Sequence, residues 1–289
     1  MNDVFFTSLG PRRGSQIRRV AGGTRARQSD RGWEIQALGT DAWTSIDHAP
    51  ETGVAAASGG WQSWSRWTNR TPNPIVSFVA EWTVPVPPAV AHGQTIYLFN
   101  GLQDATGHHI VQPVLQWGPS PARGSTNAWG LASFWVGGPD DLMFTTHWGE
   151  VAPGTVVTGR ITLVAQTNGL FSCTAEFDNY PGTQLTAENL PPMVDCVLTL
   201  ESYGTGPTAP YPRVSFTEFR AIALAPDAVA ANALGSQWRS GDQEGRRPWG
   251  LRRCRLSGDG DVTARVLEPA QIVGLLPFGL EVVCNELWR

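Results

Sequence analysis

Residues 74–88, PIVSFVAEWTVPVPP, alternate apolar with other side chains and end in a run of prolines. Alternate side chains of an extended chain share a face, so Phe78, Ala80 and Trp82 are predicted to lie on one side. Val76 is predicted to join them. Proline lacks the N–H group that a sheet ladder needs, so the prolines end the segment. This stretch therefore predicts a half-buried β-strand with a sharp end.

Comparable segments follow along the chain at intervals of roughly 12–25 residues, a spacing typical of strands and turns. They are QTIYLFNGLQD (94–104), IVQPVLQWG (110–118), NAWGLASFWVGG (127–138), GTVVTGRITLVAQ (154–166), LFSCTAEFDN (170–179), VDCVLTLESYG (194–204) and RVSFTEFRAIAL (213–224). Only residues 226–235 and 268–276 permit a helical turn. Residues 61–67, WQSWSRW, suit either one helical turn or an irregular strand. The sequence predicts an all-β chain of two packed antiparallel sheets.

The composition describes a globular protein with a large core and little charge. Of 289 residues, 41% are hydrophobic and 16% are charged, and the net charge is −4. This charge leaves no basic footprint for nucleic acid. No apolar run reaches the roughly 18–20 residues that a membrane helix needs. The cysteines form neither a CxxC pair nor a Cys/His cluster with zinc spacing, so we expect no metal and no cofactor. The pairing state is left open for Cys173, Cys196, Cys254 and Cys284.

Residues 1–32 are rich in arginine and lack the apolar stretch of roughly 7–15 residues that an export signal needs. We interpret them as a flexible tail or a pro-segment, followed by a single sandwich domain over residues 33–289. A cytoplasmic protein, a protein exported by another route and a misassigned start site all fit this N-terminus. The location and the oligomeric state are therefore left open.

Two glutamines interrupt an apolar strand in HHIVQPVLQWG, residues 108–118. Strand alternation places Gln112 and Gln116 on one face and Trp117 on the other. Burying an amide costs a few kcal/mol unless it is hydrogen-bonded. The glutamine face should therefore line a wet cleft or form a tightly paired polar patch.

Several of these segments, taken in order, resemble a known family. The segments are WQSWSRW (61–67), EWTVP (81–85), LFNGLQD (98–104), IVQPVLQWG (110–118), NAWGLASFW (127–135) and CVLTLESY (196–203). Over about residues 60–220 their order resembles the glutamic peptidases, or eqolisins, which are β-sandwich enzymes with a concanavalin-like fold. It is also similar to little-characterised fungal and bacterial proteins that share the L-F-N and I-L-Q-P-V-L-Q-W-G stretches. The resemblance implies that the strands containing residues 96–101, 110–117, 128–136 and 196–203 share one sheet.

The resemblance implies catalytic roles for Gln112, in the I-L-Q segment, and for Glu201, at the end of the A-E-W-I-V-E segment. The further positions that it implies as substrate-binding are Phe99, Gln103, Gln116, Trp129 and Tyr203. The family's W-V-G-I-D-G reads F-N-G-L-Q-D here, so Phe99 and Gln103 replace its tryptophan and aspartate. Val197 stands where the family has its first glutamate.

A glutamate and a glutamine can together hydrolyse a peptide bond, because the carboxylate takes a proton from water and the amide donates to the oxyanion. The favoured hypothesis is an acid-acting peptidase with a polypeptide substrate. A lectin-like binding module and small-molecule chemistry in the same cleft are the alternatives. We interpret His108 and His109 beside Asp104 as a turn, and residues 140–141, two aspartates, as a solvated turn.

Overall fold

The structure is a computed structural model. It describes residues 4–48, 59–70, 72, 74–88, 93–122, 127–137, 142–147, 149–203, 219–226, 238–241, 254–256 and 282–284. Within these ranges the chain forms strands and one short 3-10 helix, η1 (Gly14–Gln16). The predicted all-β class is confirmed. Residues 140–141, 227–235 and 268–276 lie outside the described residues, so the turn and helical-turn interpretations made for them stay predictions.

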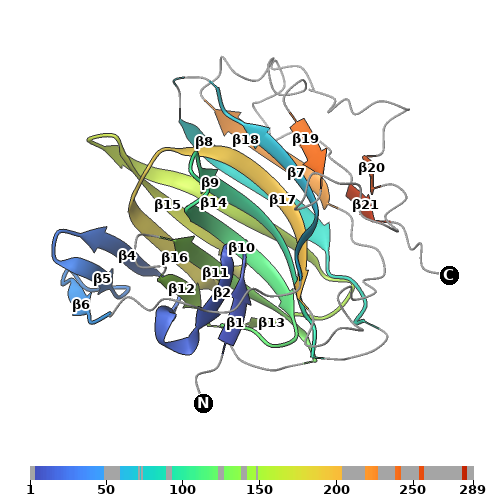
Figure 1. Cartoon of the computed structure of the whole chain (residues 1–289), viewed down its shortest axis with the longest axis horizontal. Coiled ribbons are helices and arrows are strands. Elements are labelled where there is room, and N and C mark those ends of the chain that lie inside the picture. The colour runs from blue at the N-terminus through green and yellow to red at the C-terminus, as the bar shows by residue number, and fades with distance from the viewer. Residues whose placement is uncertain are drawn as a thin grey trace.

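The first large sheet, which we call the site sheet, has nine strands (Figure 1). In spatial order they are β19 (Trp238–Gly241), β7 (Gly59–Thr68), β17 (Met193–Tyr203), β9 (Thr95–Asp104), β10 (His109–Trp117), β11 (Trp129–Gly137), β12 (Met143–Thr146) and β3 (Ile17–Val20), with β13 (Gly149–Glu150) also paired to β11. The predicted grouping of the four central segments is confirmed, because they form β9, β10, β11 and β17 of this sheet.

The second large sheet, which we call the back sheet, has eight strands. They are β18 (Phe219–Pro226), β8 (Ile75–Thr83), β14 (Val156–Thr167), β15 (Leu170–Phe177), β16 (Tyr180–Leu190), β4 (Thr24–Ser29), β5 (Gly32–Gln36) and β6 (Thr44–Ile46). The described strand pairs are antiparallel except β12 with β3 and β16 with β4. Two hairpin-like pairs stand apart, β1 (Val4–Thr7) with β2 (Gly10–Arg13), and β20 (Cys254–Leu256) with β21 (Val282–Cys284).

The main core lies between the two sheets and is built from the alternate residues of their strands. Phe78, Ala80 and Trp82 of β8 are fully buried in it, as their alternation predicts. At the start of β8, however, Ile75 and not Val76 joins the core. The register between β8 and β18 shifts at that end of the strand, and the simple alternation breaks there. Local irregularity therefore changes which side chain is buried.

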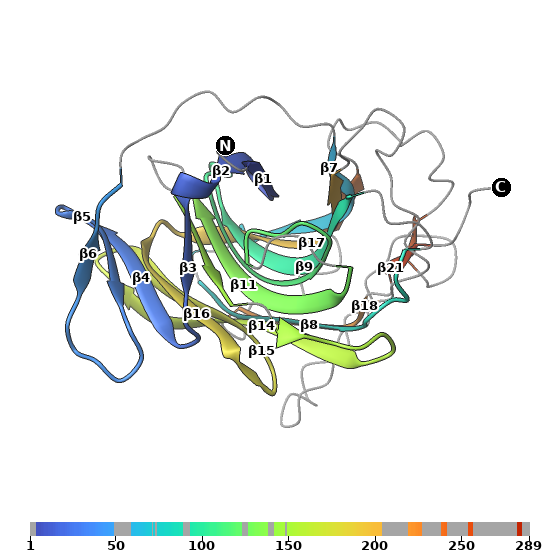
Figure 2. The ribbon, with the colours of Figure 1, turned by 90° about the horizontal axis from the view of Figure 1, so that it is seen from below.

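A second apolar cluster lies on the other face of the site sheet. Its members are Ile17, Tyr97, Phe99, Ile110, Val114, Ala122, Ala132, Phe134, Val136, Met143, Val197 and Tyr203. Figure 2 shows the site sheet curving around the β1–β2 pair, with the back sheet on the opposite side. Phe5, Phe6 and Leu9 of the β1–β2 segment pack against this cluster. The concave face is thus covered by the N-terminal hairpin and not by the back sheet.

The N-terminal segment differs from the predicted flexible tail. β3 pairs with β12 of the site sheet, and β4 pairs with β16 of the back sheet. The expected boundary at residue 32 falls inside the β4–β5 hairpin, where Ser29 is the partner of Gly32. β3 and β4 are therefore part of the sandwich, β1 and β2 form a separate pair on its concave face, and whether the N-terminal segment is removed stays a proposal.

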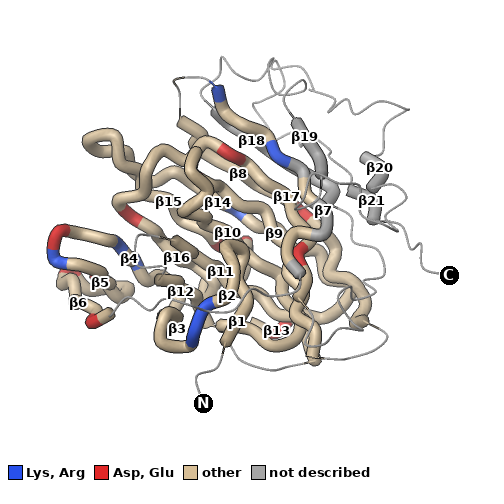
Figure 3. Tube along the Cα trace, in the orientation of Figure 1, with Lys and Arg blue, Asp and Glu red and all other residues tan. Residues whose placement is uncertain are grey.

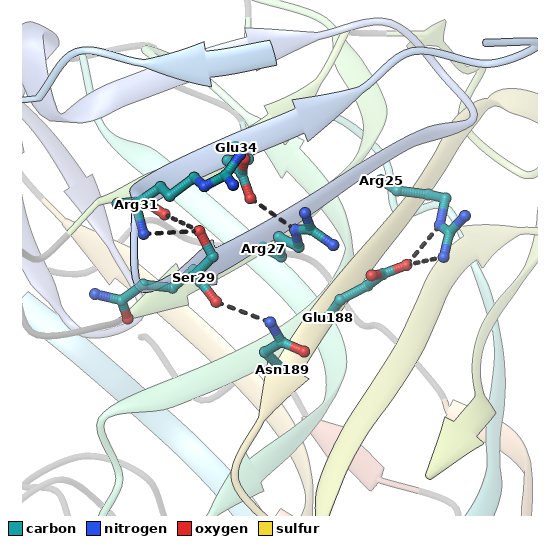
Figure 4. A network of polar contacts seen from close by, with 9 residues as sticks. Arg25, Arg27, Ser29, Arg31, Glu34, Glu188 and Asn189 are labelled. Atoms are coloured by element: carbon teal, nitrogen blue, oxygen red, sulfur yellow. Dashed lines mark hydrogen bonds and ion pairs between the residues drawn. The ribbon is translucent and has the colours of Figure 1, made fainter. Parts of the chain in front are cut away.

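Arginines conceal the strand pattern of β4. Thr24 and Ala26 are buried, while Arg25 and Arg27, which alternate with them, are paired with acids at the sheet surface. Figure 4 shows Arg25 bound to Glu188 and Arg27 bound to Glu34, with the Arg27 Nε to Glu34 Oε2 distance at 2.8 Å. A two-residue period is present, but its polar half is arginine. The predicted flexible tail rested on arginine content. Arginine content does not distinguish a mobile segment from a strand such as β4, whose polar face is arginine.

The Trp61–Trp64–Trp67 segment forms strand β7 and not a helical turn. A register shift against β17 lies between Leu200 and Glu201. Trp67 is buried in the core between the sheets, whereas Trp61 packs against Phe99 of the concave-face cluster. Figure 3 shows long stretches without charged residues through the middle of the sheets. The site described next lies on the concave face of this uncharged region.

Candidate active site

Gln112 and Glu201 project from the same face of the site sheet. Gln112 lies on β10 and Glu201 on β17, with β9 between them. The face assignment follows from the clusters, because Val111, Leu115 and Trp117 belong to the core between the sheets and Val114 to the concave face. The predicted placement of Gln112 and Gln116 opposite Trp117 is confirmed. We call Gln112 and Glu201 the dyad. Both side chains are fully buried, at 0% exposure.

A single hydroxyl group joins the two side chains. Gln112 Nε2 donates a hydrogen bond to Ser8 Oγ at 2.6 Å, and Ser8 Oγ donates to Glu201 Oε2 at 3.0 Å. Ser8 lies in the turn between β1 and β2. The register of β10 on β9 pairs residues 111 with 102 and 114 with 99, so Gln112 falls opposite Gly101. Glu201 pairs with Tyr97, four positions from Gly101 on β9, so the two partners lie diagonally across this strand.

Tyr203 occupies the other oxygen of Glu201. Its hydroxyl group contacts Glu201 Oε1 and lies 2.8 Å from the carbonyl oxygen of Thr7. The Tyr203 hydroxyl group has one hydrogen, so it can donate to only one of these two oxygens. Both contacts are hydrogen bonds only when Glu201 is protonated and supplies the second hydrogen. Glu201 then donates to Tyr203 Oη, and Tyr203 donates to the Thr7 carbonyl. A second tyrosine binds the hairpin backbone in the same way, because Tyr97 Oη donates to the carbonyl oxygen of Phe6 at 2.7 Å.

The pKa shifts at the site agree with a protonated Glu201. Burial raises the pKa of Glu201 from 4.5 to about 7, although hydrogen bonds from Tyr203 and Ser8 act in the opposite direction. Burial also raises the pKa of Tyr97 and of Tyr203, and the charge of Glu201 adds to both shifts. The positive charge of Arg12 on β2 opposes the rise at Tyr203. Burial is the largest cause of the Glu201 shift, so this carboxyl is held neutral below about pH 7.

Aromatic contacts fix the hairpin on this face. Phe6 stacks on Tyr203 with ring centroids 4.8 Å apart, and Tyr97 meets the edge of Phe134 at 5.9 Å. Phe99 is fully buried and lies 6.2 Å from Trp61. Three residues of the predicted cleft, Phe99, Gln116 and Tyr203, therefore lie on the dyad's side of the sheet.

The other two predicted cleft residues, Trp129 and Gln103, make no described contact with Gln112 or Glu201. Trp129 is packed against Trp117 in the core between the sheets, with ring centroids 5.6 Å apart. The motif match named the tryptophan itself, but strand parity turns that position toward the back sheet. Gln103 accepts from Arg66 Nη2 at 3.3 Å and donates to the Gly107 carbonyl at 3.5 Å, without a described contact to the dyad.

Polar atoms without partners remain beside the dyad. Gln112 Oε1, Thr199 Oγ1 and Trp61 Nε1 are buried and have no hydrogen-bond partner among the described residues. Leaving such an atom unpaired costs about 1–3 kcal/mol. Gln116 Oε1 does have a partner, because it accepts from Ser120 Oγ. The buried polar atoms around the dyad thus have fewer hydrogen bonds than those of an ordinary core.

The turn predicted around the histidine pair covers residues 105–108, and His109 begins β10. Asp104 Oδ1 accepts from the backbone N–H of His109 at 2.8 Å, and Asp104 Oδ2 accepts from Thr106. Burial lowers the pKa of His109, partly offset by Asp104. Cys173 and Cys196 are free, buried thiols. No cluster of metal-ligating side chains is found among the described residues, and no helix there is long and apolar enough to cross a bilayer.

Ser8, Tyr97 and Thr7 were missed from the sequence. Ser8 precedes Leu9-Gly10-Pro11, which is a turn signal after an apolar run, and this signal was available. Tyr97 shares its strand face with Phe99, so parity could have placed it in the cleft. Nothing in the sequence connects Thr7 with Tyr203.

The fold and the site together define a class, a two-sheet β-sandwich whose concave face carries a bridged glutamine and glutamate. No protein-family profile and no curated protein sequence matches the chain. Solved structures do. Scytalido-glutamic peptidase with a peptide-based transition-state analogue is 11% identical, with a TM-score of 0.38 over 58% of this chain and 82% of that chain.

A second structure of that peptidase, with a transition-state analogue inhibitor, is 13% identical, with a TM-score of 0.39 over 60% of this chain and 82% of that one. SCP-B, a member of the eqolisin family in complex with the tripeptide Ala-Ile-His, is 11% identical, with a TM-score of 0.37 over 58% and 81%. The solved structures to which this chain is similar thus include eqolisins.

Proposed function

We propose that this chain is a glutamic-type endopeptidase that uses Glu201 and Gln112. The observation that carries the proposal is the position of Ser8 Oγ, which accepts from Gln112 Nε2 and donates to Glu201 Oε2. A water molecule at the same point would make the same two contacts. It would then be held beside a base and next to an amide donor, which is what hydrolysis of a peptide bond requires.

In this mechanism Glu201 takes a proton from the water as the water attacks the carbonyl carbon of the substrate. Gln112 Nε2 donates to the oxyanion that forms, and Glu201 returns its proton to the leaving amine. While the hairpin covers the concave face, which we call the closed state, Tyr203 Oη lies against the Thr7 carbonyl. In the peptidase, Tyr203 Oη is a second donor suited to a substrate carbonyl. No metal and no covalent intermediate enters these steps.

The substrate must replace the N-terminal hairpin, because Ser8 fills the space between the two side chains. Water then reaches Glu201, and its pKa falls toward the ordinary value of 4.5 as the burial is relieved. The base is then ionised in moderate acid, the range that the family resemblance implies. Phe6 and Leu9 pack on the concave face, so we expect apolar side chains to be accepted there.

The test is digestion of casein between about pH 3 and pH 7 by the full chain and by a chain without residues 1–13. A longer deletion to residue 32 would also remove β3 and β4, one strand from each large sheet. We expect the shortened chain to digest casein faster. Glu201→Gln should abolish digestion, and Gln112→Ala should lower kcat by about 10²–10³, the usual loss for one oxyanion donor.

Two matched controls separate function from folding. Gln36→Ala removes a buried amide and Glu188→Gln removes a buried carboxylate, both from the back sheet. Both should keep most of the activity. If neither the full nor the shortened chain digests casein, the peptidase proposal fails, and glycans and small hydrophobic ligands become the candidates for this cleft.

A further inference from the structure

One peptide bond of the chain, Thr7–Ser8, lies directly against the dyad. On its carbonyl side, the Thr7 oxygen is 2.8 Å from Tyr203 Oη. On its amine side, the Ser8 hydroxyl group donates to Glu201 Oε2 at 3.0 Å. A hydrogen-bond donor thus faces the carbonyl oxygen while a carboxyl group faces the adjacent hydroxyl. These groups lie far apart in the sequence, since 193 positions separate Ser8 from Glu201.

A serine hydroxyl that follows a carbonyl can attack it within the same chain. The attack converts the amide into an ester, a rearrangement known as an N→O acyl shift, and it needs a base for the hydroxyl and a donor for the oxyanion. Holding the groups together removes much of the entropic part of the barrier. The hairpin is held by the Phe6–Tyr203 stack and by Tyr97 Oη on the Phe6 carbonyl.

We propose that the chain cleaves its own Thr7–Ser8 bond, with Ser8 as nucleophile, Glu201 as base and Tyr203 as oxyanion donor. The proposal shares Glu201 with the proposed peptidase, but it does not require any external substrate to enter the cleft. Ser8 Oγ stands where the attacking water would stand in that peptidase. While the hairpin is bound, the available nucleophile is therefore the side chain and not water.

The atoms balance as follows. Glu201 carboxylate accepts the Ser8 hydroxyl proton, and Oγ forms a bond to the Thr7 carbonyl carbon. Tyr203 Oη, which no longer faces a charged carboxylate, keeps its proton and donates a hydrogen bond to the Thr7 oxyanion. The carbon–nitrogen bond then breaks, and Glu201 returns the proton to the Ser8 nitrogen. Water finally hydrolyses the Thr7–Ser8 ester, which releases residues 1–7 with a terminal carboxylate and leaves Ser8 with a free amine and its hydroxyl group.

The acid dependence separates this step from cleavage of an external substrate. Self-cleavage starts from the closed state, in which burial raises the pKa of Glu201 to about 7. Only the carboxylate form accepts the proton, so the rate should rise with pH through about 7. The described ionisable groups that interact with Glu201 or its hydrogen-bond partner are Tyr97, Tyr203 and Arg12. The tyrosines stay neutral in this range because their pKa values are raised.

The experiment follows the intact mass of the purified full chain over time between about pH 5 and pH 8. We expect a species that lacks residues 1–7 and begins at Ser8, formed at a rate that is independent of protein concentration. Hydroxylamine should speed cleavage, because it attacks the ester. Ser8→Ala should abolish cleavage at this bond, Ser8→Cys should retain it, and Tyr203→Phe should slow it about a hundredfold. Ser15→Ala is the matched control and should cleave normally.

Cleavage of the Ser8→Ala variant at the same bond would overturn the proposal, because water and not Ser8 would then be the nucleophile. An intact chain at every pH, with the hairpin protected from hydrogen exchange, would overturn it as well. The peptidase proposal is tested separately, by measuring casein digestion with the chain that lacks residues 1–13. This chain has no Thr7–Ser8 bond. Self-cleavage without casein digestion supports this inference alone.

Discussion

The two faces of the site sheet are equally buried but differently covered. The face toward the back sheet carries Leu98, Leu115 and Trp135 against eight strands. The concave face carries Gln112 and Glu201, and its cover at the dyad is the two-stranded N-terminal hairpin. Low exposure alone does not distinguish a core from a closed site. The polar groups do, because Gln112 and Glu201 are hydrogen-bonded to Ser8 in the hairpin turn, and the pKa of Glu201 is raised there.

The largest expected effect belongs to the face toward the back sheet. Trp135 is 1% exposed and packs against Trp33 at 5.1 Å and Phe144 at 5.4 Å. Trp135→Ala should lower the free energy of unfolding by about 3–5 kcal/mol, the usual cost of such a cavity. Denaturant unfolding measures it. Leu170→Ala, at a residue 42% exposed, should stay within about 0.5 kcal/mol. Equal losses would mean that the sheets do not pack as described.

The second prediction concerns the pH dependence of stability. The folded state raises the pKa of Glu201 from 4.5 to about 7, so it binds a proton that the unfolded state releases. The contribution of neutral Glu201 is fully present below about pH 4.5 and is lost as the pH rises through about 7. It amounts to about 3 kcal/mol.

Glu201→Gln should remove this pH dependence, since an amide does not titrate. Thermal or denaturant unfolding of both proteins between about pH 4 and pH 8 gives the difference between them. Contributions from other titrating groups cancel in that difference. Parallel curves would show that Glu201 is solvated, and would place water between the hairpin and the sheet.

The third prediction tests how weakly the concave face is covered. Phe6→Ala removes the stack on Tyr203 and should reduce the free energy of hairpin opening by about 1–2 kcal/mol. Amide hydrogen exchange should then quicken in residues 4–13, while β9 and β10 remain protected. Val4→Ala changes a residue that is 47% exposed and serves as the control. Faster exchange throughout the sheets would show that hairpin and sandwich unfold together.

The smallest effect is expected at Gln116, which shares the face of Gln112 but does not contact the hairpin turn. Gln116→Met keeps the volume, removes the hydrogen bond from Ser120 and also removes the unpaired Nε2. These changes oppose each other, so the stability should change by less than about 1 kcal/mol. Denaturant unfolding checks this value. A larger loss would mean that the Gln116 amide has a further partner.

Strand alternation was a reliable guide where pairing is regular. It correctly placed Gln112 and Gln116 opposite Trp117, because β10 keeps one register along both neighbours. It was less reliable at Ile75 and Val76, where the register with β18 shifts. Trp129 shows a different weakness, since a motif match identifies a position but not the face to which that position is turned.

The sequence by itself determined the β class, the central strands and the faces of their side chains, because a two-residue period is a local property of an extended chain. Only the tertiary structure decided that Ser8 lies between Gln112 and Glu201. Ser8 is 104 positions from one and 193 from the other, so no local pattern records the contact. It also decided the protonation of Glu201, because the pKa of a carboxyl group depends on the water and the donors that the surrounding fold leaves beside it.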